Sequence, residues 1–209
     1  DAYSREQLRL HFFHMNLAEN SVGFSPKALL EPEKKGEYDP VVYEGNLLTN
    51  IYNRLIRSCF YTMQKHFGSR LPTLPVTPED REEAGQLTVA FENAMARFEF
   101  NRAFELLDQY LRQMNKRWAE RSSAAASEEC RAQLLVDSFH AVRTALTLLH
   151  PLAPDGTERV REYLRADARI WDWAYIFEPL PFFFEEGSAH EMKFLEPRVD
   201  FFEKPETQY

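Results

Sequence analysis

The residues best suited to chemistry in this sequence are Asn46, Asn50 and Arg54, three polar side chains spaced four residues apart. Residues with this spacing lie on one face of a helix, and apolar residues fill the opposite face. An amide can offer a paired donor and acceptor to a base edge, while a guanidinium offers a rigid fork of donors. The row therefore favours recognition of unpaired nucleotides. The spacing also fits a plain solvated surface on which Arg54 pairs with an acid from a neighbouring helix.

The charge distribution limits what kind of nucleic-acid contact is possible. The formal net charge of -8 argues against sequence-independent attraction to a polyanion, so such a partner would need a local basic face. The segment 45–78 contains no Asp or Glu and carries Arg54, Arg57, Lys65 and Arg70. A second stretch has a basic excess, formed by Arg102, Arg112, Lys116, Arg117 and Arg121. Taken alone, both runs are equally typical of ordinary solvated helix surfaces.

Other classes of chemistry find little support in the sequence. His11 and His14 could share a metal ion, but no Cys or carboxylate stands at a supporting spacing. The seven glycines form no phosphate-cradling loop, and no nucleophile elbow is present. We therefore expect no metal, no cofactor and no catalytic residue in this chain. Cys59 and Cys130 are expected to be buried free thiols of a reducing compartment.

Hydrophobic periodicity predicts an all-α protein. The second helix is expected from about Pro40 to Phe67, where Gly68 ends it, and Thr77 and Pro78 begin the next. Thr157 is expected to cap a short final helix. The predicted helices cover roughly residues 4–15, 40–67, 78–98, 101–118, 127–149 and 157–164, with the RSSAAAS stretch as a loop. Short loops between long amphipathic segments indicate an antiparallel helix bundle.

The C-terminal segment differs in composition from the bundle. After Asp167 the sequence becomes rich in aromatic residues and proline, as in IWDWAYIFEPLPFFFEEG. So many Phe and Trp side chains are expected to need burial, which predicts an extended tail that lies against a surface. No apolar run is long enough to span a bilayer, and the N-terminus lacks the charged-then-apolar pattern of a signal peptide. We therefore expect a soluble, cytoplasmic chain, and the missing initiator Met indicates a longer parent protein.

Several strings resemble class I aminoacyl-tRNA synthetases. DAYSREQLR is similar to the junction that follows their catalytic domain, through Tyr3, Leu8 and Arg9. NSVGFS resembles their Asp-x-x-Phe-Ser element through Phe24 and Ser25. NLLTNIYNR is most like the Asn-x-x-x-Asn-x-x-x-Arg helix of the methionyl members. Weaker likeness continues through Ala103, Asn115, Leu148, Leu149, Pro151, Pro154, Leu164 and the ending HEMKFLEPRVDFFEK.

This resemblance implies the fold and role of a class Ia anticodon-binding domain. Residues 1–39 would be the junction helix and loop, 40–167 the anticodon-binding bundle, and 168–209 a tail on the bundle or on the absent catalytic domain. Expected anticodon contacts are Asn46, Asn50, Arg54, Arg57, Asn115 and Trp118. Expected phosphate contacts are Lys65, Arg112, Lys116 and Arg117. Trp118 is the candidate stacking platform, because the Pro-Trp pair of the methionyl members is absent.

The resemblance also fixes what the parent protein would do. It would be an ATP-dependent aminoacyl-tRNA ligase, with methionine as the expected amino acid, while ATP and Mg²⁺ would bind the absent catalytic domain. The active-site motifs of the class occur nowhere in this sequence, so the chain would select tRNA without performing chemistry. The expected partners are the tRNA anticodon stem-loop and the catalytic domain, with no membrane and no DNA.

Two alternatives remain open from the sequence. The same domain could come from an isoleucyl, valyl, leucyl or cysteinyl synthetase. Alternatively, the chain could be a helical protein-interaction module that binds no RNA. Such a module would use the aromatic cluster of Trp171, Trp173, Phe177, Phe182, Phe183 and Phe184.

Overall fold

The computed structural model describes residues 2–17, 19, 21–24, 39–125, 127–187 and 189–209. Within these ranges the chain is all-α, as predicted, and forms no β-sheet. The main helices are α1 (Arg5–His14), α2 (Pro40–Asn46), α3 (Asn53–Phe67), α4 (Pro78–Ala96), α5 (Phe100–Ala124), α6 (Glu128–Leu149) and α7 (Pro154–Leu164). Ser25 of the Phe-Ser resemblance lies outside the described residues.

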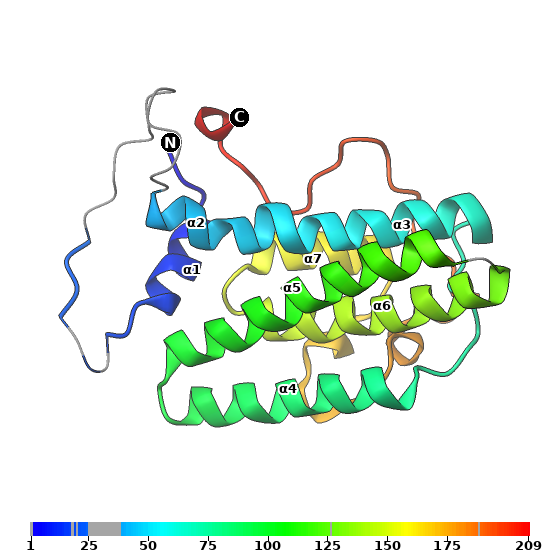
Figure 1. The fold of residues 1–209 in the computed structure, drawn as a ribbon, viewed down its shortest axis with the longest axis horizontal. Coiled ribbons are helices and arrows are strands. Elements are labelled where there is room, and N and C mark those ends of the chain that lie inside the picture. The colour runs from blue at the N-terminus through cyan, green and yellow to red at the C-terminus, as the bar shows by residue number, and fades with distance from the viewer. Residues whose placement is uncertain (1, 18, 20, 25–38, 126, 188) are drawn as a thin grey trace.

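The helices pack as an antiparallel bundle (Figure 1). α3, α5 and α6 run beside one another, α4 covers α5 and α6 on one side, and α1 packs beneath α2 and against α5. The C-terminal tail passes along α3 on its way to the end of the chain, near the N-terminal segment. Among the described residues, no helix is both long and apolar enough to cross a membrane.

Local sequence signals explain where most helices begin and end. Ser4 accepts a hydrogen bond from the backbone N–H of Gln7, whose side chain in turn accepts one from the Ser4 N–H, which completes a capping box. Pro78 occupies the first turn of α4, as predicted. Gly68 follows α3 with φ of 56°, a left-handed conformation that glycine adopts without strain.

The predicted helix 40–67 is continuous but not uniformly α. Its middle is a π-helical stretch, η2 (Leu47–Tyr52), which separates α2 from α3. Such wide turns are rare and often occur at functional sites. The stretch contains Asn50 and lies between Asn46 and Arg54, so it determines how the three predicted contact residues are aligned.

Three local predictions were wrong. α5 continues through most of the RSSAAAS stretch and ends only at Ala124. α7 begins at Pro154 rather than at Thr157, whose hydroxyl is buried inside the helix and donates to the carbonyl of Ala153. Cys130 is exposed in the first turn of α6, whereas Cys59 is buried as expected.

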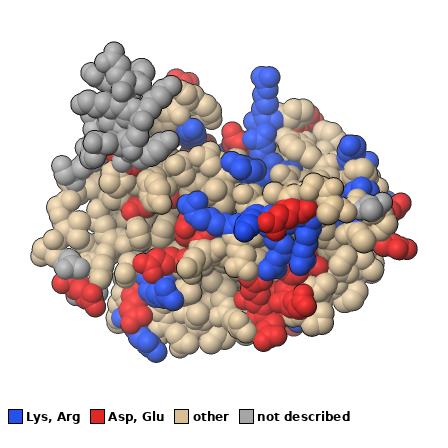
Figure 2. All heavy atoms as spheres, viewed as in Figure 1, with Lys and Arg blue, Asp and Glu red and all other residues tan. Residues whose placement is uncertain are grey.

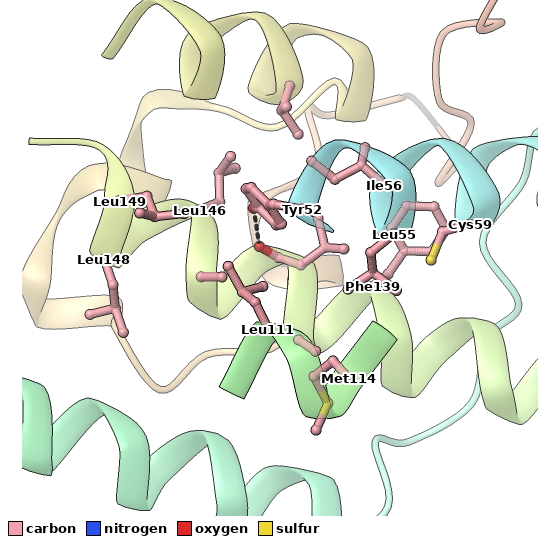
Figure 3. Close-up of a cluster of buried hydrophobic side chains, with 14 of the residues drawn as sticks. Tyr52, Leu55, Ile56, Cys59, Leu111, Met114, Phe139, Leu146, Leu148 and Leu149 are labelled. Carbon is pink, nitrogen blue, oxygen red and sulfur yellow. Dashed lines mark hydrogen bonds between the residues drawn. The ribbon is translucent and has the colours of Figure 1, made fainter. Parts of the chain in front are cut away.

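The core lies where α3, α5 and α6 meet (Figure 3). Tyr52 is fully buried there, and its hydroxyl donates to the carbonyl of Val142 across 2.7 Å. This bond satisfies a polar group that would otherwise cost free energy in an apolar setting. Leu55, Ile56 and Cys59 continue the same buried stripe along α3. The burial of this stripe sets which side of α3 faces solvent.

The tail packs on the bundle of this same chain through short 3₁₀ turns. Arg143 of α6 is buried, and its guanidinium donates to the carbonyls of Ile176 and Tyr175 and lies 4.9 Å from the Phe183 ring centroid. Further along, Phe202 packs so closely on Gly156 that a Cβ at this glycine would lie 2.3 Å from its ring. These contacts hold the tail on α6 and α7.

Candidate nucleic-acid interface

A groove lies between the solvent side of α3 and the last residues of the tail. It has a volume of about 420 Å³. The preceding π-helical stretch η2 contributes Asn50, α3 contributes Arg54, and the tail contributes Lys204 and Tyr209. Its remaining lining is mostly polar and comprises Thr49, Asn53, Arg57, Ser58, Tyr61, Asp200 and Phe202. We call this feature the α3 groove.

Two of the three residues in the predicted row line the α3 groove. Asn50 and Arg54 are both exposed, and within the described part of the chain Arg54 makes no hydrogen bond or ion pair. Asn46 is half-buried and does not line the groove. Its side-chain oxygen accepts a hydrogen bond of 2.7 Å from the Asn50 amide. Asn46 therefore orients Asn50, while Asn50 and Arg54 face the solvent together.

Arg57 also lines the groove but is already paired. Its guanidinium donates to the Asp200 carboxylate across 2.9 Å, and the same oxygen accepts a bond of 2.6 Å from Asn53. The carbonyl oxygen of the buried Asn53 side chain accepts from the backbone N–H of Phe201 across 3.0 Å. These bonds fasten the tail to α3, which makes Arg57 part of the groove wall.

The candidates on α5 lie elsewhere, because none of them lines the α3 groove. Trp118 is only 8 % exposed and belongs to the core, so its indole presents almost no surface for a base. Asn115 is half-buried on the same helix, and Lys65 of α3 is exposed beyond the groove. The structure therefore does not bring Asn50 and Arg54 together with the predicted contact residues on α5.

The basic residues of α5 are neutralised within the chain. Arg112 donates to Asp108 across 2.8 Å, and this hydrogen bond raises the pKa of Arg112. Arg117 contacts both Asp80 and Glu83 of α4, and Lys116 lies 3.9 Å from Glu120. Figure 2 shows basic and acidic side chains interleaved over α5 and more uniformly basic side chains over α3. A phosphate would compete with these carboxylates on α5 but not at Arg54.

The two histidines considered for metal binding share a carboxylate instead. Their Nδ1 atoms lie 2.5 Å and 2.6 Å from the two oxygens of Glu44, for His11 and His14 respectively. The hydrogen bond to Glu44 raises the pKa of His14. Over the described ranges, no three His, Cys, Asp or Glu side chains gather in a way that could hold a metal. These contacts of His11 and His14 with Glu44 join α1 to α2, and we call them the Glu44 clasp.

The aromatic cluster of the tail divides between core and surface. Phe183 is fully buried, Phe184 nearly so, and Trp171 stacks on His150 with ring centroids 3.8 Å apart. Phe177 is 60 % exposed, and Trp173 and Phe182 are also exposed. Half of the cluster therefore serves the packing of the tail.

The overall fold matches solved synthetase structures. The free state of methionyl-tRNA synthetase from Mycobacterium tuberculosis aligns over 98 % of this chain, with a TM-score of 0.68 and 15 % identity. The same enzyme bound to methionyl-adenylate aligns over 78 % of this chain, with a TM-score of 0.64 and 17 % identity. The chain has the fold of a helical part of methionyl-tRNA synthetase. It spans only 33 % and 39 % of the length of those synthetase chains. No family model matches the sequence.

At 15–17 % identity, the similarity to methionyl-tRNA synthetase shows a shared fold only. The α3 groove also contains residues that the sequence motifs did not indicate. Asn53, Tyr61 and Ser58 lie on the same side of α3 as Arg54 and could have been found from helical spacing. Asp200, Lys204 and Tyr209 come from the tail. Nothing in the sequence indicated that residues so far along the chain would complete this site.

Proposed function

We propose that the α3 groove binds unpaired nucleotides of a tRNA anticodon loop. The observation that carries this proposal is the exposure of Asn50 and Arg54 side by side in the groove, with Arg54 unpaired within the described residues. A solvated guanidinium beside an oriented amide is a suitable pair for a base edge and its phosphate. The shared fold with methionyl-tRNA synthetase supports the same role.

The geometry suggests how the two groups would divide the recognition. One N–H of the Asn50 amide is donated to Asn46, which leaves the carbonyl oxygen and the second N–H free for a base. Arg54 would stack on a base or hold a phosphate. A base that could not complete the bonds to Asn50 would leave polar groups unsatisfied, at a cost of about 1–3 kcal/mol. Selection of the anticodon would follow from this penalty.

The role of the whole protein extends the same proposal. The chain would be the anticodon-binding part of an ATP-dependent aminoacyl-tRNA ligase, with methionine as the amino acid. ATP, Mg²⁺ and the chemistry of charging would belong to a catalytic domain, and the chain would work in the cytoplasm. The choice of methionine rests on the Asn-x-x-x-Asn-x-x-x-Arg pattern together with the fold shared with methionyl-tRNA synthetase.

Alanine substitution at Asn50 and Arg54 tests the function. We expect each of Asn50→Ala and Arg54→Ala to weaken binding of the methionine tRNA anticodon stem-loop by about tenfold, since each removes bonds worth about 1–2 kcal/mol. Fluorescence anisotropy would measure affinity, and circular dichroism would check the fold. α4 offers a matched control in Asn93 and Arg97, an exposed pair with the same spacing. Equal affinity of wild type, test variants and control variants would reject the groove.

Binding of a protein by the exposed Trp173, Phe177 and Phe182 is the alternative function. The two functions differ in their response to salt. Phosphate contacts release counterions, so RNA affinity should fall steeply as salt rises, whereas docking through aromatic side chains should not. An interaction that survives high salt and is lost in Phe177→Ala would support the alternative.

A further inference from the structure

We infer that Tyr209 is a stacking platform for a nucleotide base held in the α3 groove. The inference rests on the proposed function and adds a residue that makes a specific contact to the RNA. Aromatic side chains are the usual partners of splayed bases, because every base offers a π-face.

The ring of Tyr209 is open to solvent at the edge of the groove. Its residue is 82 % exposed, although it lines the same groove as Asn50 and Arg54. The ammonium of Lys204 lies 5.3 Å from the ring centroid. A cation near one side of the ring leaves room for a base and places a positive charge where its phosphate would lie.

The turn that carries Tyr209 is fastened to the N-terminal segment. Gln208 donates to the carbonyl of Ala2 across 2.7 Å and to the side chain of Gln7 across 3.0 Å. Gln7 is 1 % exposed and belongs to the capping box of α1, so this anchor is part of the folded structure. The backbone N–H of Tyr209 also donates to the carbonyl of Glu206. These bonds hold the backbone of Tyr209 beside the groove before any ligand binds, which lowers the cost of ordering this residue.

The other aromatic rings near the groove are less suitable. Phe202 is buried, and Trp118 belongs to the core and does not line the groove. Tyr61 is half-buried, with the Arg57 guanidinium 5.8 Å from its ring centroid and its hydroxyl donating to the carbonyl of Glu196. Of the aromatic residues that line the groove, Tyr209 is therefore the one with a freely exposed ring.

The charge of the groove suits a nucleotide rather than a neutral aromatic ligand. Its lining includes the cations Arg54, Arg57 and Lys204 and one acidic side chain, Asp200, which pairs with Arg57. Arg54 and Lys204 thus remain for phosphate groups, one on each side of the groove. A base stacked on Tyr209 would have Asn50 within the same groove to bond its edge.

Substitution of Tyr209 tests the inference on the full chain. Tyr209→Leu should weaken binding of the methionine tRNA anticodon stem-loop by about tenfold or more, since one base–aromatic stack is lost. Tyr209→Phe keeps the ring and should bind within about twofold of wild type. Phe177→Leu removes another exposed aromatic side chain from a different part of the tail and is the matched control. A stem-loop with 2-aminopurine at single loop positions should show quenching at one position in wild type and recovery in Tyr209→Leu.

Each outcome has a defined meaning. If Tyr209→Leu binds as tightly as wild type while Arg54→Ala binds weakly, the stacking role is overturned and the function of the groove stands. If Phe177→Leu loses as much affinity as Tyr209→Leu, the loss is a general effect of the tail and the inference fails. If wild type does not bind the stem-loop at all, the proposed function fails, and the role of Tyr209 fails with it.

Discussion

The solvent sides of α3 and α5 both carry arginine and lysine, but the two helices leave these cations in different states. On α3, Arg54 is exposed and unpaired within the described residues, beside a groove. On α5, Arg112 and Arg117 are bound by carboxylates of the same helix or of α4. Although α5 has more basic residues than α3, its cations already hold carboxylate partners, whereas α3 leaves a cation available to a polyanion.

The cause of the difference is visible in the spacing of the acids. No Asp or Glu occurs from residue 45 to 78, so cations on α3 find partners only from distant segments such as Asp200. On α5, acids stand three or four residues from the cations, as in Asp108 and Arg112 or Lys116 and Glu120. Residues at this spacing meet on a helix surface. The number of Arg and Lys residues on a helix is thus a weak predictor of anion binding unless the Asp and Glu residues nearby are counted too.

Charge reversal on the two helices should give the largest contrast. Arg54→Glu removes a free cation and adds a repulsive charge, so RNA affinity should fall roughly a hundredfold, equivalent to about 2–3 kcal/mol. The salt slope of binding should also decrease by about one. Arg112→Glu changes the charge equally on α5 and should alter affinity by less than about threefold, because Arg112 already pairs with Asp108. Anisotropy titrations at several salt concentrations measure both, and equal losses would abolish the distinction between the faces.

The helical bundle could be predicted from the sequence because helices are specified by local sequence patterns. Periodic apolar residues and terminal signals such as Gly68 and Pro78 predicted the end of α3 and the start of α4. The burial of Trp118 was also foreseeable, since it continues the buried stripe of Leu107, Leu111 and Met114. The apolar stripe predicted the burial of Trp118 better than did the base-stacking role that the resemblance implied.

Only part of the α3 groove could be predicted from the sequence. Asn50 and Arg54 could be found from their spacing, but the π-helical stretch between α2 and α3 has no sequence signal of its own. The partner of Arg57 stands 143 residues away, and helical periodicity carries no information about such pairs. Tyr209 follows a short 3₁₀ turn, Glu206–Gln208, whose place depends on contacts with Ala2 and Gln7. These features follow from tertiary packing, which single-sequence patterns do not encode.

Removal of Arg117 should show that the α5 cations serve stability. Asp80 is nearly buried and contacts Arg117, so Arg117→Ala leaves a carboxylate without its main partner. We expect the free energy of unfolding to fall by about 2 kcal/mol, with RNA affinity unchanged. Arg102→Ala breaks the exposed pair with Glu105 on the same helix and should cost less than about 0.5 kcal/mol. Urea unfolding of both variants measures these values, and a loss of RNA binding in Arg117→Ala would assign α5 to the interface.

Two histidines outside α3 and α5, His140 of α6 and His14 of α1, should change the stability in opposite directions as the pH falls. His140 lies near Asp80, Arg81 and Arg143, and burial, assisted by these arginines, lowers its pKa from 6.5 to about 4. Between these values the unfolded chain binds a proton that the folded chain does not, so stability falls as the pH falls. His14 behaves in the reverse way, because the Glu44 carboxylate raises its pKa. Its contribution is complete below pH 6.5 and is lost as the pH rises through its raised value.

Melting experiments at pH 5 and pH 7 separate the two histidines. From its shift alone, His140 should make the wild type about 2 kcal/mol less stable at pH 5. His140→Leu should remove most of this loss, although the substitution also alters packing at a buried position, so the comparison must be made between pH values within each variant. His14→Gln should have the smaller effect and should enlarge the loss at pH 5, since it removes the opposing contribution of the clasp with Glu44. If His14→Gln left the pH dependence of stability unchanged, the contact between His14 and Glu44 would not contribute to the free energy of unfolding through protonation.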